Sequence, residues 1–305
     1  MLMKKTVLVT GANGFIGKEM VGYLVGEGYT VVGQSRFGGI TSQGVIPYVS
    51  NLMDKEEIVS LIVNYQISSI IHLAGPSNVN LTEIDFVEGI SILDNLLSAI
   101  KHVPNKPLLI LASSSKVYDD REDGPVSEHD QVNPSTLYGK YKVCCEDICR
   151  RYYNTYDIPL VILRFANVFG KGDHNKSRLV PSILTALYDN EVPSILSNGE
   201  GILDFIYIED VIECIVYLIK LVQLGKSDII GQVLNLGGGC GITTHKVIDT
   251  IVTMYNQLHN EHAVYNLGTR KSSQNLTLSM NNMEKLTGWF PKYSFDYGIY
   301  EIIKA

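Results

Sequence analysis

The pattern of apolar residues changes at about residue 170. Before this point, short runs of Val, Ile and Leu alternate with longer segments whose apolar positions follow a helical period. Near-continuous apolar strands joined by helices are typical of a parallel sheet that is covered on both faces. Because crossovers between parallel strands are right-handed, we expect an α/β fold with a doubly wound parallel (Rossmann) sheet.

The same pattern places the individual elements. Expected strands are residues 6–10, 29–34, 69–73, 108–113, 160–164 and 233–236. Expected helices are residues 15–27, 55–65, 84–100, 138–153, 179–188 and 209–224. The tail after residue 240 is polar and irregular around a helix. We therefore expect a dinucleotide-binding domain of residues 1–170 plus about 209–237, and a smaller interleaved substrate-binding lobe of about 171–208 plus 238–305.

Composition narrows the class of protein. Hydrophobic residues make up 45% and charged residues 19% of the chain, which is ordinary for a globular protein. A net charge of -7 argues against a nucleic-acid groove, which needs a basic stripe. The sequence shows no signal-peptide pattern and no run of 18 apolar residues. We expect no membrane partner and a cytoplasmic location.

The five cysteines are odd in number, and three of them fall in one expected helix. A disulfide framework is therefore not expected, and a reducing compartment fits better. Cys145 and Cys149 have helical spacing, but no His or carboxylate pattern completes a ligand set. We expect no metal site.

A glycine-rich loop follows the first expected strand. The segment Gly11-Ala-Asn13-Gly14-Phe15-Ile16-Gly17 leads directly into a helix. Its three glycines allow a tight turn, close approach of the backbone to a pyrophosphate, and close packing of helix on strand. The helix N-terminus then offers N–H groups to the phosphates. The loop predicts a dinucleotide site.

The end of the second strand indicates which dinucleotide binds. An NAD site usually has Asp or Glu here, for the ribose 2′-hydroxyl. This chain has Ser35-Arg36, and the next acidic residue is Asp54. Arg36 can pair with a 2′-phosphate, and Ser35 can donate a hydrogen bond. We expect NADP(H) as the cofactor, unless Arg36 is only a solvated loop residue.

A serine-rich strand end and a YxxxK pattern supply the candidate chemistry. Three serines, Ser113, Ser114 and Ser115, end a buried strand, and Tyr138 and Lys142 share one face of a later helix. A neighbouring ammonium favours the ionised form of a phenol. The phenol can then exchange a proton with a substrate oxygen while hydride moves to or from nicotinamide. A serine hydrogen-bonds the same oxygen.

Across nearly its whole length the chain resembles the nucleotide-sugar branch of the extended short-chain dehydrogenase/reductases. Seven segments carry the resemblance, in the family's order: TGANGFIG (10–17), HLAG (72–75), SSSKVY (113–118), YGKYK (138–142), RFANVFG (164–170), DFIYIED (204–210) and GWFP (288–291). The resemblance implies that the residue four before Tyr118, which is Ser114, is the catalytic serine, with Tyr138 and Lys142 as its catalytic partners.

The resemblance also implies further contacts. Asn51 and Leu52 would lie near the adenine, and Leu73, Ala74 and Gly75 near the nicotinamide-side ribose. The expected substrate-binding residues are Ser77, Ser115, Asn167 and Arg270. His72 is expected to support the sheet rather than act as an acid. Two of the expected helices, 84–100 and 138–153, would form a homodimer interface.

Departures from the family pattern favour some activities over others. Sugar-nucleotide 4,6-dehydratases have acidic residues after the catalytic Thr, where this chain has Ser115 and Lys116. Leu203 replaces a phosphate-binding Arg, and Lys271-Ser-Ser replaces the Pro-Gly-Asp that usually follows the position of Arg270. We expect an NADPH-dependent reductase of a 4-keto-6-deoxy nucleotide sugar. A nucleotide-sugar 4-epimerase and a non-catalytic dinucleotide-sensing module are the alternatives.

Overall fold

The computed structural model describes residues 5–40, 42–77, 80–121, 124–271 and 275–304. The chain divides into two compact units. Unit 1 comprises Met1–Val117, Pro134–Arg164 and Ile212–Leu234, and unit 2 comprises Tyr118–Asn133, Phe165–Val211 and Asn235–Ala305. Each unit is therefore built from three separate stretches of the chain.

Unit 1 is organised around a seven-stranded sheet with the order β10-β6-β5-β4-β1-β2-β3. The strands are β1 (Thr6–Thr10), β2 (Thr30–Ser35), β3 (Val45–Val49), β4 (Ile67–His72), β5 (Leu108–Ser114), β6 (Leu160–Phe165) and β10 (Val233–Leu236). β1 pairs in parallel with β2 and β4, β2 with β3, and β4 with β5. The strand order reverses between β1 and β4, which is where doubly wound sheets bind ligands. The predicted fold class is confirmed.

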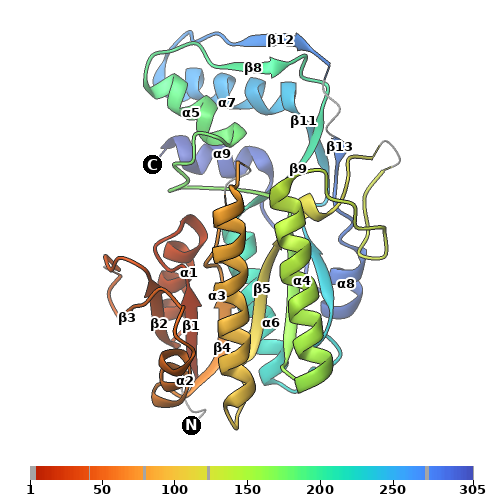
Figure 1. Cartoon of the computed structure of the whole chain (residues 1–305). Coiled ribbons are helices and arrows are strands. Elements are labelled where there is room, and N and C mark those ends of the chain that lie inside the picture. The colour runs from red at the N-terminus through yellow and green to blue at the C-terminus, as the bar shows by residue number, and fades with distance from the viewer. Residues whose placement is uncertain (1–4, 41, 78–79, 122–123, 272–274, 305) are drawn as a thin grey trace. The chain divides into compact units, whose positions relative to one another are not determined.

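Helices cover this sheet. They are α1 (Phe15–Gly26), α2 (Lys55–Asn64), α3 (Glu83–His102), α4 (Leu137–Tyr156) and α6 (Ile208–Gln223), the last of which begins in unit 2. α3 packs against both α2 and α4, and Figure 1 shows α3 and α4 side by side in front of the strands. Side chains of Asp54, Thr82 and Thr136 cap α2, α3 and α4. Within the described ranges, no helix is both long and apolar enough to cross a bilayer.

Unit 2 holds two small sheets. β9 (Ile202–Tyr207) pairs with β11 (Gly241–Thr243), β13 (Asn275–Leu276) and β7 (Asn167–Phe169), while β8 (Ser194–Ser197) pairs with β12 (Asn266–Arg270). The helices are α5 (Leu179–Tyr188), α7 (Thr244–His259), α8 (Asn281–Thr287) and α9 (Phe295–Lys304), and α7 packs against α5 and α9. Aromatic rings of Phe169, Phe205 and Phe295 meet with centroids 4.9–6.2 Å apart. The tail is therefore more regular than the sequence indicated.

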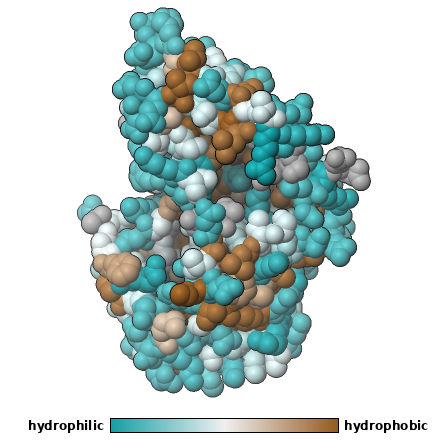
Figure 2. Space-filling model, turned by 45° about the horizontal axis from the view of Figure 1, so that its top comes forward, coloured by the Kyte–Doolittle hydropathy of each residue, from teal (hydrophilic) through white to brown (hydrophobic). Residues whose placement is uncertain are grey.

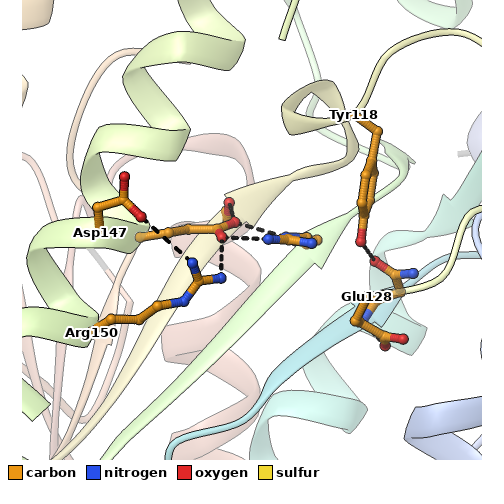
Figure 3. Close-up of polar contacts among 8 residues, drawn as sticks. Tyr118, Glu128, Asp147 and Arg150 are labelled. Carbon is orange, nitrogen blue, oxygen red and sulfur yellow. Dashed lines mark hydrogen bonds and ion pairs between the residues drawn. The ribbon is translucent and has the colours of Figure 1, made fainter. Parts of the chain in front are cut away.

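Two segments of the expected dinucleotide domain, residues 118–133 and 165–170, belong to unit 2. Asn235 holds the first of them, because its amide accepts a hydrogen bond from the Tyr118 hydroxyl at 2.8 Å and donates to the Val126 carbonyl at 2.9 Å. Its backbone N–H donates to the Glu128 carboxylate at 2.6 Å. Figure 3 shows the Tyr118 hydroxyl pointing at this amide, with Glu128 close by.

The sequence pattern also missed β3. This strand lies at the edge of the sheet, and its residues are half-buried or exposed. Pro47 lies in its centre, paired with Gly33. Proline is tolerated on an edge strand because one side of the strand makes no ladder hydrogen bonds. The strand was not predicted because its apolar and polar residues alternate only weakly and because a proline lies in its centre.

Candidate active site

The glycine loop after β1 leaves no room for side chains. Gly11 has φ +69°, and a Cβ on it would lie 2.9 Å from the Ala74 nitrogen. A Cβ on Gly17 would lie 2.2 Å from the Gly11 carbonyl oxygen, and one on Gly14 3.1 Å from the same oxygen. These distances are too short for a real side chain at positions 11 and 17. Helix α1 can therefore lie directly on the loop, as the sequence predicted.

The first turn of α1 fits the phosphates of a dinucleotide. Gly14 is the N-cap and has no side chain to cap the helix, and the first turn contains no acidic residue. Phe15 and Ile16 open the helix, so their backbone belongs to this turn. The Asn13 amide donates to the Gly38 carbonyl, which ties the glycine loop to the segment after β2. A positive helix end with glycines on its approach is the arrangement that holds pyrophosphate.

The end of β4 is held by Thr10. Its hydroxyl oxygen accepts hydrogen bonds from the backbone N–H groups of Leu73 at 3.2 Å and Ala74 at 3.1 Å. The hydroxyl proton then remains for His72 Nδ1, 2.9 Å away. Burial, together with the charge of Lys142, lowers the pKa of His72 from 6.5 to about 3. His72 is therefore neutral and supports the sheet, in agreement with its expected role.

Gly75 follows this strand end in a conformation that favours glycine, with φ +130°. A Cβ there would lie 2.7 Å from the Tyr141 hydroxyl oxygen on α4. Ser77, two residues further on, is exposed in the loop before α3. The loop of Leu73, Ala74 and Gly75 thus packs closely against the helix that carries Tyr138.

The ribose end of the expected cofactor site contains a charge pair. Arg36 Nη1 lies 3.2 Å from Glu88 Oε1 on α3. Ser35 is buried, and its hydroxyl donates to the Gly38 carbonyl at 3.2 Å. The Ser35 hydroxyl therefore has a partner within its own loop. The partner of Arg36 was not predicted, because Glu88 is 52 positions further along the chain.

The expected adenine contacts lie in a sharp turn after β3. Leu52 is buried and has φ +58°, which is uncommon for a residue other than glycine. The turn is held by side chains, because Asn51 Oδ1 accepts from the Met53 N–H and Ser50 Oγ accepts from the Leu52 N–H. Asn95 on α3 donates to the Met53 carbonyl at 3.2 Å. Several hydrogen bonds thus fix a strained backbone at this site.

Three consecutive serines have different surroundings. The Ser113 hydroxyl donates to Glu146 Oε1 at 2.6 Å. Ser114 Oγ accepts from the Lys116 N–H at 3.2 Å, which leaves its proton available to another acceptor. All three, including Ser115, are buried. Ser113 is thus committed to a structural contact, and Ser114 remains the predicted catalytic serine.

Tyr138 and Lys142 lie in the first turns of α4. Lys142 Nζ donates to the Ala112 carbonyl at 2.8 Å, and it lies 5.7 Å from the centre of the Tyr138 ring. Gly139 allows α4 to approach the serine strand, since a Cβ on it would lie 2.1 Å from the Lys116 carbonyl oxygen. The structure therefore brings the Lys142 ammonium beside the Tyr138 phenol. It also packs the start of α4 against the end of β5, which carries the serines.

A buried ion pair behind these residues was not predicted. Arg164 donates through Nε to Glu146 Oε1 at 2.9 Å and through Nη2 to Oε2 at 2.7 Å. Figure 3 shows Arg150 reaching from α4 toward Glu146 and toward Asp147. The signal in the sequence was a charged residue at the end of the otherwise apolar strand LVILRF. A charge there requires a buried partner.

The remaining expected substrate residues lie in unit 2. The Asn167 amide donates to the Asp204 carbonyl at 2.8 Å, and Arg270 is exposed at the end of β12. Leu203, which stands where the family pattern has a phosphate-binding Arg, is buried in β9 and belongs to the core of this unit. Among the residues that the structure describes, no group of three or more His, Cys, Asp or Glu side chains has the arrangement of a metal site.

The doubly wound fold, the order of its strands and the glycine loop after β1 together define a class of protein. This class is the dinucleotide-binding enzymes of the extended short-chain dehydrogenase/reductase type. Residues 7–237 match the sequence profile of the "NAD dependent epimerase/dehydratase family". The chain belongs to this family. Its relatives include nucleotide-sugar epimerases, dehydratases and a reductase.

Individual relatives show the spread of activities. The dTDP-4-dehydro-6-deoxyglucose reductase of Escherichia coli is 25% identical over 99% of this chain and 98% of its own. The UDP-glucose 4-epimerase of Mycolicibacterium smegmatis is 24% identical over 97% of each chain. The structure of UDP-glucuronic acid 4-epimerase from Bacillus cereus, in complex with UDP-glucuronic acid and NAD, is similar with a TM-score of 0.83 and 25% identity over 98% of this chain and 99% of that one.

Proposed function

We propose that this enzyme is an NADPH-dependent reductase of a 4-keto-6-deoxy nucleotide sugar. The observation that carries the proposal is the end of β2, where Arg36 stands and where no acidic residue occurs before Asp54. A guanidinium fits a 2′-phosphate, whereas NAD sites generally use a carboxylate at this position. A net reduction draws on an exchangeable NADPH pool, in contrast to an epimerase that recycles its cofactor.

The contacts of three residues support the catalytic roles that we propose for them. When bound, the reduced nicotinamide would supply a hydride to the sugar carbonyl carbon. Tyr138 would give its phenolic proton to the carbonyl oxygen, and Ser114 would donate a hydrogen bond to the same oxygen. Lys142, held by the Ala112 carbonyl, places its positive charge beside the Tyr138 ring, on the side of the reaction where negative charge would develop.

The substrate side also supports reduction over dehydration. Ser115 and Lys116 follow Ser114 where dehydratases of the family carry acidic residues. Without a carboxylic acid and its base, water cannot be eliminated by the route that those enzymes use. We assign Ser77, Ser115, Asn167 and Arg270 to substrate binding.

An NAD-dependent nucleotide-sugar 4-epimerase is the second candidate. The observation that favours it is Glu88, which brings a carboxylate to 3.2 Å from Arg36. A carboxylate in this region can accept a hydrogen bond from a ribose 2′-hydroxyl. Several relatives are epimerases as well.

One pair of assays separates the two candidates. A reductase consumes NADPH with dTDP- or UDP-linked 4-keto-6-deoxy sugars, which is followed by the loss of nicotinamide absorbance. An epimerase converts UDP-glucose to UDP-galactose without net consumption of cofactor, which is followed by NMR. Turnover of UDP-glucose with no oxidation of NADPH by any keto sugar would reject the reductase. An Arg36→Ala variant with unchanged NADPH affinity would reject the cofactor assignment.

We further propose a homodimer that forms through α3 and α4. Ile84 and Val87 on α3 are 79% and 63% exposed. Figure 2 shows apolar side chains on the part of the surface that these two helices form in Figure 1. A monomeric mass by light scattering at micromolar concentration would overturn the proposal.

The five cysteines are free thiols, which supports a reducing, cytoplasmic location.

A further inference from the structure

The pair of Arg36 and Glu88 lies where the cofactor's ribose is expected. Arg36 follows β2 and Glu88 lies on α3, and their side chains are 56% and 44% exposed. The Arg36 guanidinium carbon also lies 5.3 Å from the centre of the Phe37 ring. Arg36 thus has a carboxylate on one side and an aromatic ring on another.

A second carboxylate lies nearby. Hydrogen bonds from the Thr82 hydroxyl and backbone lower the pKa of Asp85, and the charge of Arg36 lowers it further. Asp85 and Glu88 are three positions apart on α3, which places them on neighbouring turns of one face. The Arg36 guanidinium therefore lies close to two carboxylates, those of Glu88 and Asp85.

We propose that Glu88 is a specificity-determining residue that weakens the enzyme's discrimination between NADP(H) and NAD(H). The inference rests on the proposed role of Arg36 at the 2′-phosphate. Glu88 occupies Nη1 of the guanidinium that the phosphate needs, so the carboxylate and the phosphate compete for one cation. A 2′-hydroxyl carries no charge and meets no such competition.

The charges decide the direction and size of the effect. An exposed ion pair is weak, so Glu88 can be displaced, but its carboxylate remains close to an incoming phosphate. Two like groups about 6 Å apart in water repel each other by about 1 kcal/mol, and salt reduces this. Removing the charge of Glu88 should therefore tighten binding of 2′-phosphorylated ligands about three- to tenfold at low ionic strength.

The experiment measures binding rather than turnover. Purified protein and its Glu88→Gln variant are titrated by calorimetry with NADPH, with NADH and with 2′,5′-ADP, which isolates the adenosine end. Glu83→Gln is the matched control, because it removes the same charge from an exposed position near the start of α3. Each titration is repeated at high salt and in the Arg36→Ala background.

The expected result is a gain for Glu88→Gln with NADPH and with 2′,5′-ADP, and a change of less than about twofold with NADH. The gain should shrink at high salt, be absent in Glu83→Gln, and be smaller when Arg36 is absent. An equal gain for both cofactors, no gain, or the same gain without Arg36 would each overturn the proposal. Unchanged NADPH affinity in Arg36→Ala would instead reject the proposed function's cofactor assignment.

Discussion

Glu146 and Arg164 form a bidentate ion pair that is almost completely buried, with side-chain exposures of 2% and 1%. Every oxygen of the carboxylate has two donors, since Oε1 also accepts from Ser113 and Oε2 from Arg150. Together with Ser113, the pair joins three elements, β5, α4 and β6. Glu146 lies one helical turn beyond Lys142, and Ser113 precedes Ser114, so the network holds together the two elements that carry the catalytic residues.

Breaking this pair should destabilise the protein strongly. Glu146→Gln leaves the Arg164 charge buried without a counter-charge, which costs about 3–5 kcal/mol in the free energy of unfolding. Urea denaturation of the variant and of Arg150→Ala measures the difference. Arg150 is 41% exposed, so its loss should cost less than about 1 kcal/mol. Similar losses for both variants would show that the buried pair contributes no more than a surface contact.

The serine series should separate stability from chemistry. Ser113→Ala removes a buried donor to Glu146 and should lower the free energy of unfolding by about 1–2 kcal/mol. Ser114→Ala should instead lower kcat, with little effect on unfolding, because its proton is free for the substrate oxygen. Ser115→Ala should have the mildest effect on kcat. A kcat that depends on Ser115 and not on Ser114 would mean that the catalytic serine is assigned one position too early.

Tyr138→Phe should lower kcat by about 10²–10⁴-fold, since general acid catalysis contributes this much. NADPH affinity should stay within about twofold of the wild type, because the hydroxyl acts only where a proton moves. Lys142→Ala should lower both kcat and cofactor affinity. Steady-state kinetics and cofactor titration measure the two quantities separately. Near-normal turnover in both variants and in Ser114→Ala would show that these three residues do not carry the chemistry. Dinucleotide binding by the wild-type protein without turnover of any substrate would favour the dinucleotide-sensing module.

Substitutions of two glycines in α1, Gly17 and Gly22, serve as a test and its matched control. Gly17→Ala puts a Cβ 2.2 Å from the Gly11 carbonyl oxygen, so α1 must move away from the phosphate loop. Cofactor affinity should fall more than tenfold, and stability should fall as well. Gly22→Ala meets no atom within 4 Å and should stabilise the helix by about 0.5–1 kcal/mol. Thermal unfolding and NADPH titration report both effects. Equal behaviour of the two variants would contradict the packing argument.

Asp204 should make stability depend on pH. Burial raises the pKa of its carboxyl from 3.8 to about 7, although backbone N–H groups, including those of Leu278 and Gly238, lower it. Between pH 3.8 and about pH 7, Asp204 therefore keeps its proton in the folded chain and has lost it in the unfolded chain. The free energy of unfolding should therefore fall as pH rises through this window.

Comparison with Asp204→Asn tests this dependence. The amide does not titrate, so the variant should show a flatter profile between about pH 5 and pH 8. It should also be less stable at pH 5, because Gly238 and Leu278 donate to different oxygens and an amide has only one. Identical slopes for both proteins would assign the pH dependence to other groups.

The sequence by itself determined the parts that depend on local pattern. Buried strands, amphipathic helices and the glycine loop each have a short-range signal, because periodicity and turn chemistry act within a few residues. The doubly wound sheet and the family resemblance followed from their order along the chain. The edge strand β3 was missed because Pro47 and half-buried positions weaken that signal.

Only the tertiary structure decided which distant polar groups meet. Glu88 reaches Arg36 across 52 positions, Glu146 reaches Arg164 across 18, and Asn235 reaches Tyr118 across 117. No local propensity encodes such pairings, since they arise where separate elements pack and where burial makes an unpaired charge or amide costly. The sequence therefore named the residues that resemble a catalytic set, while the fold supplied the partners that position and tune them.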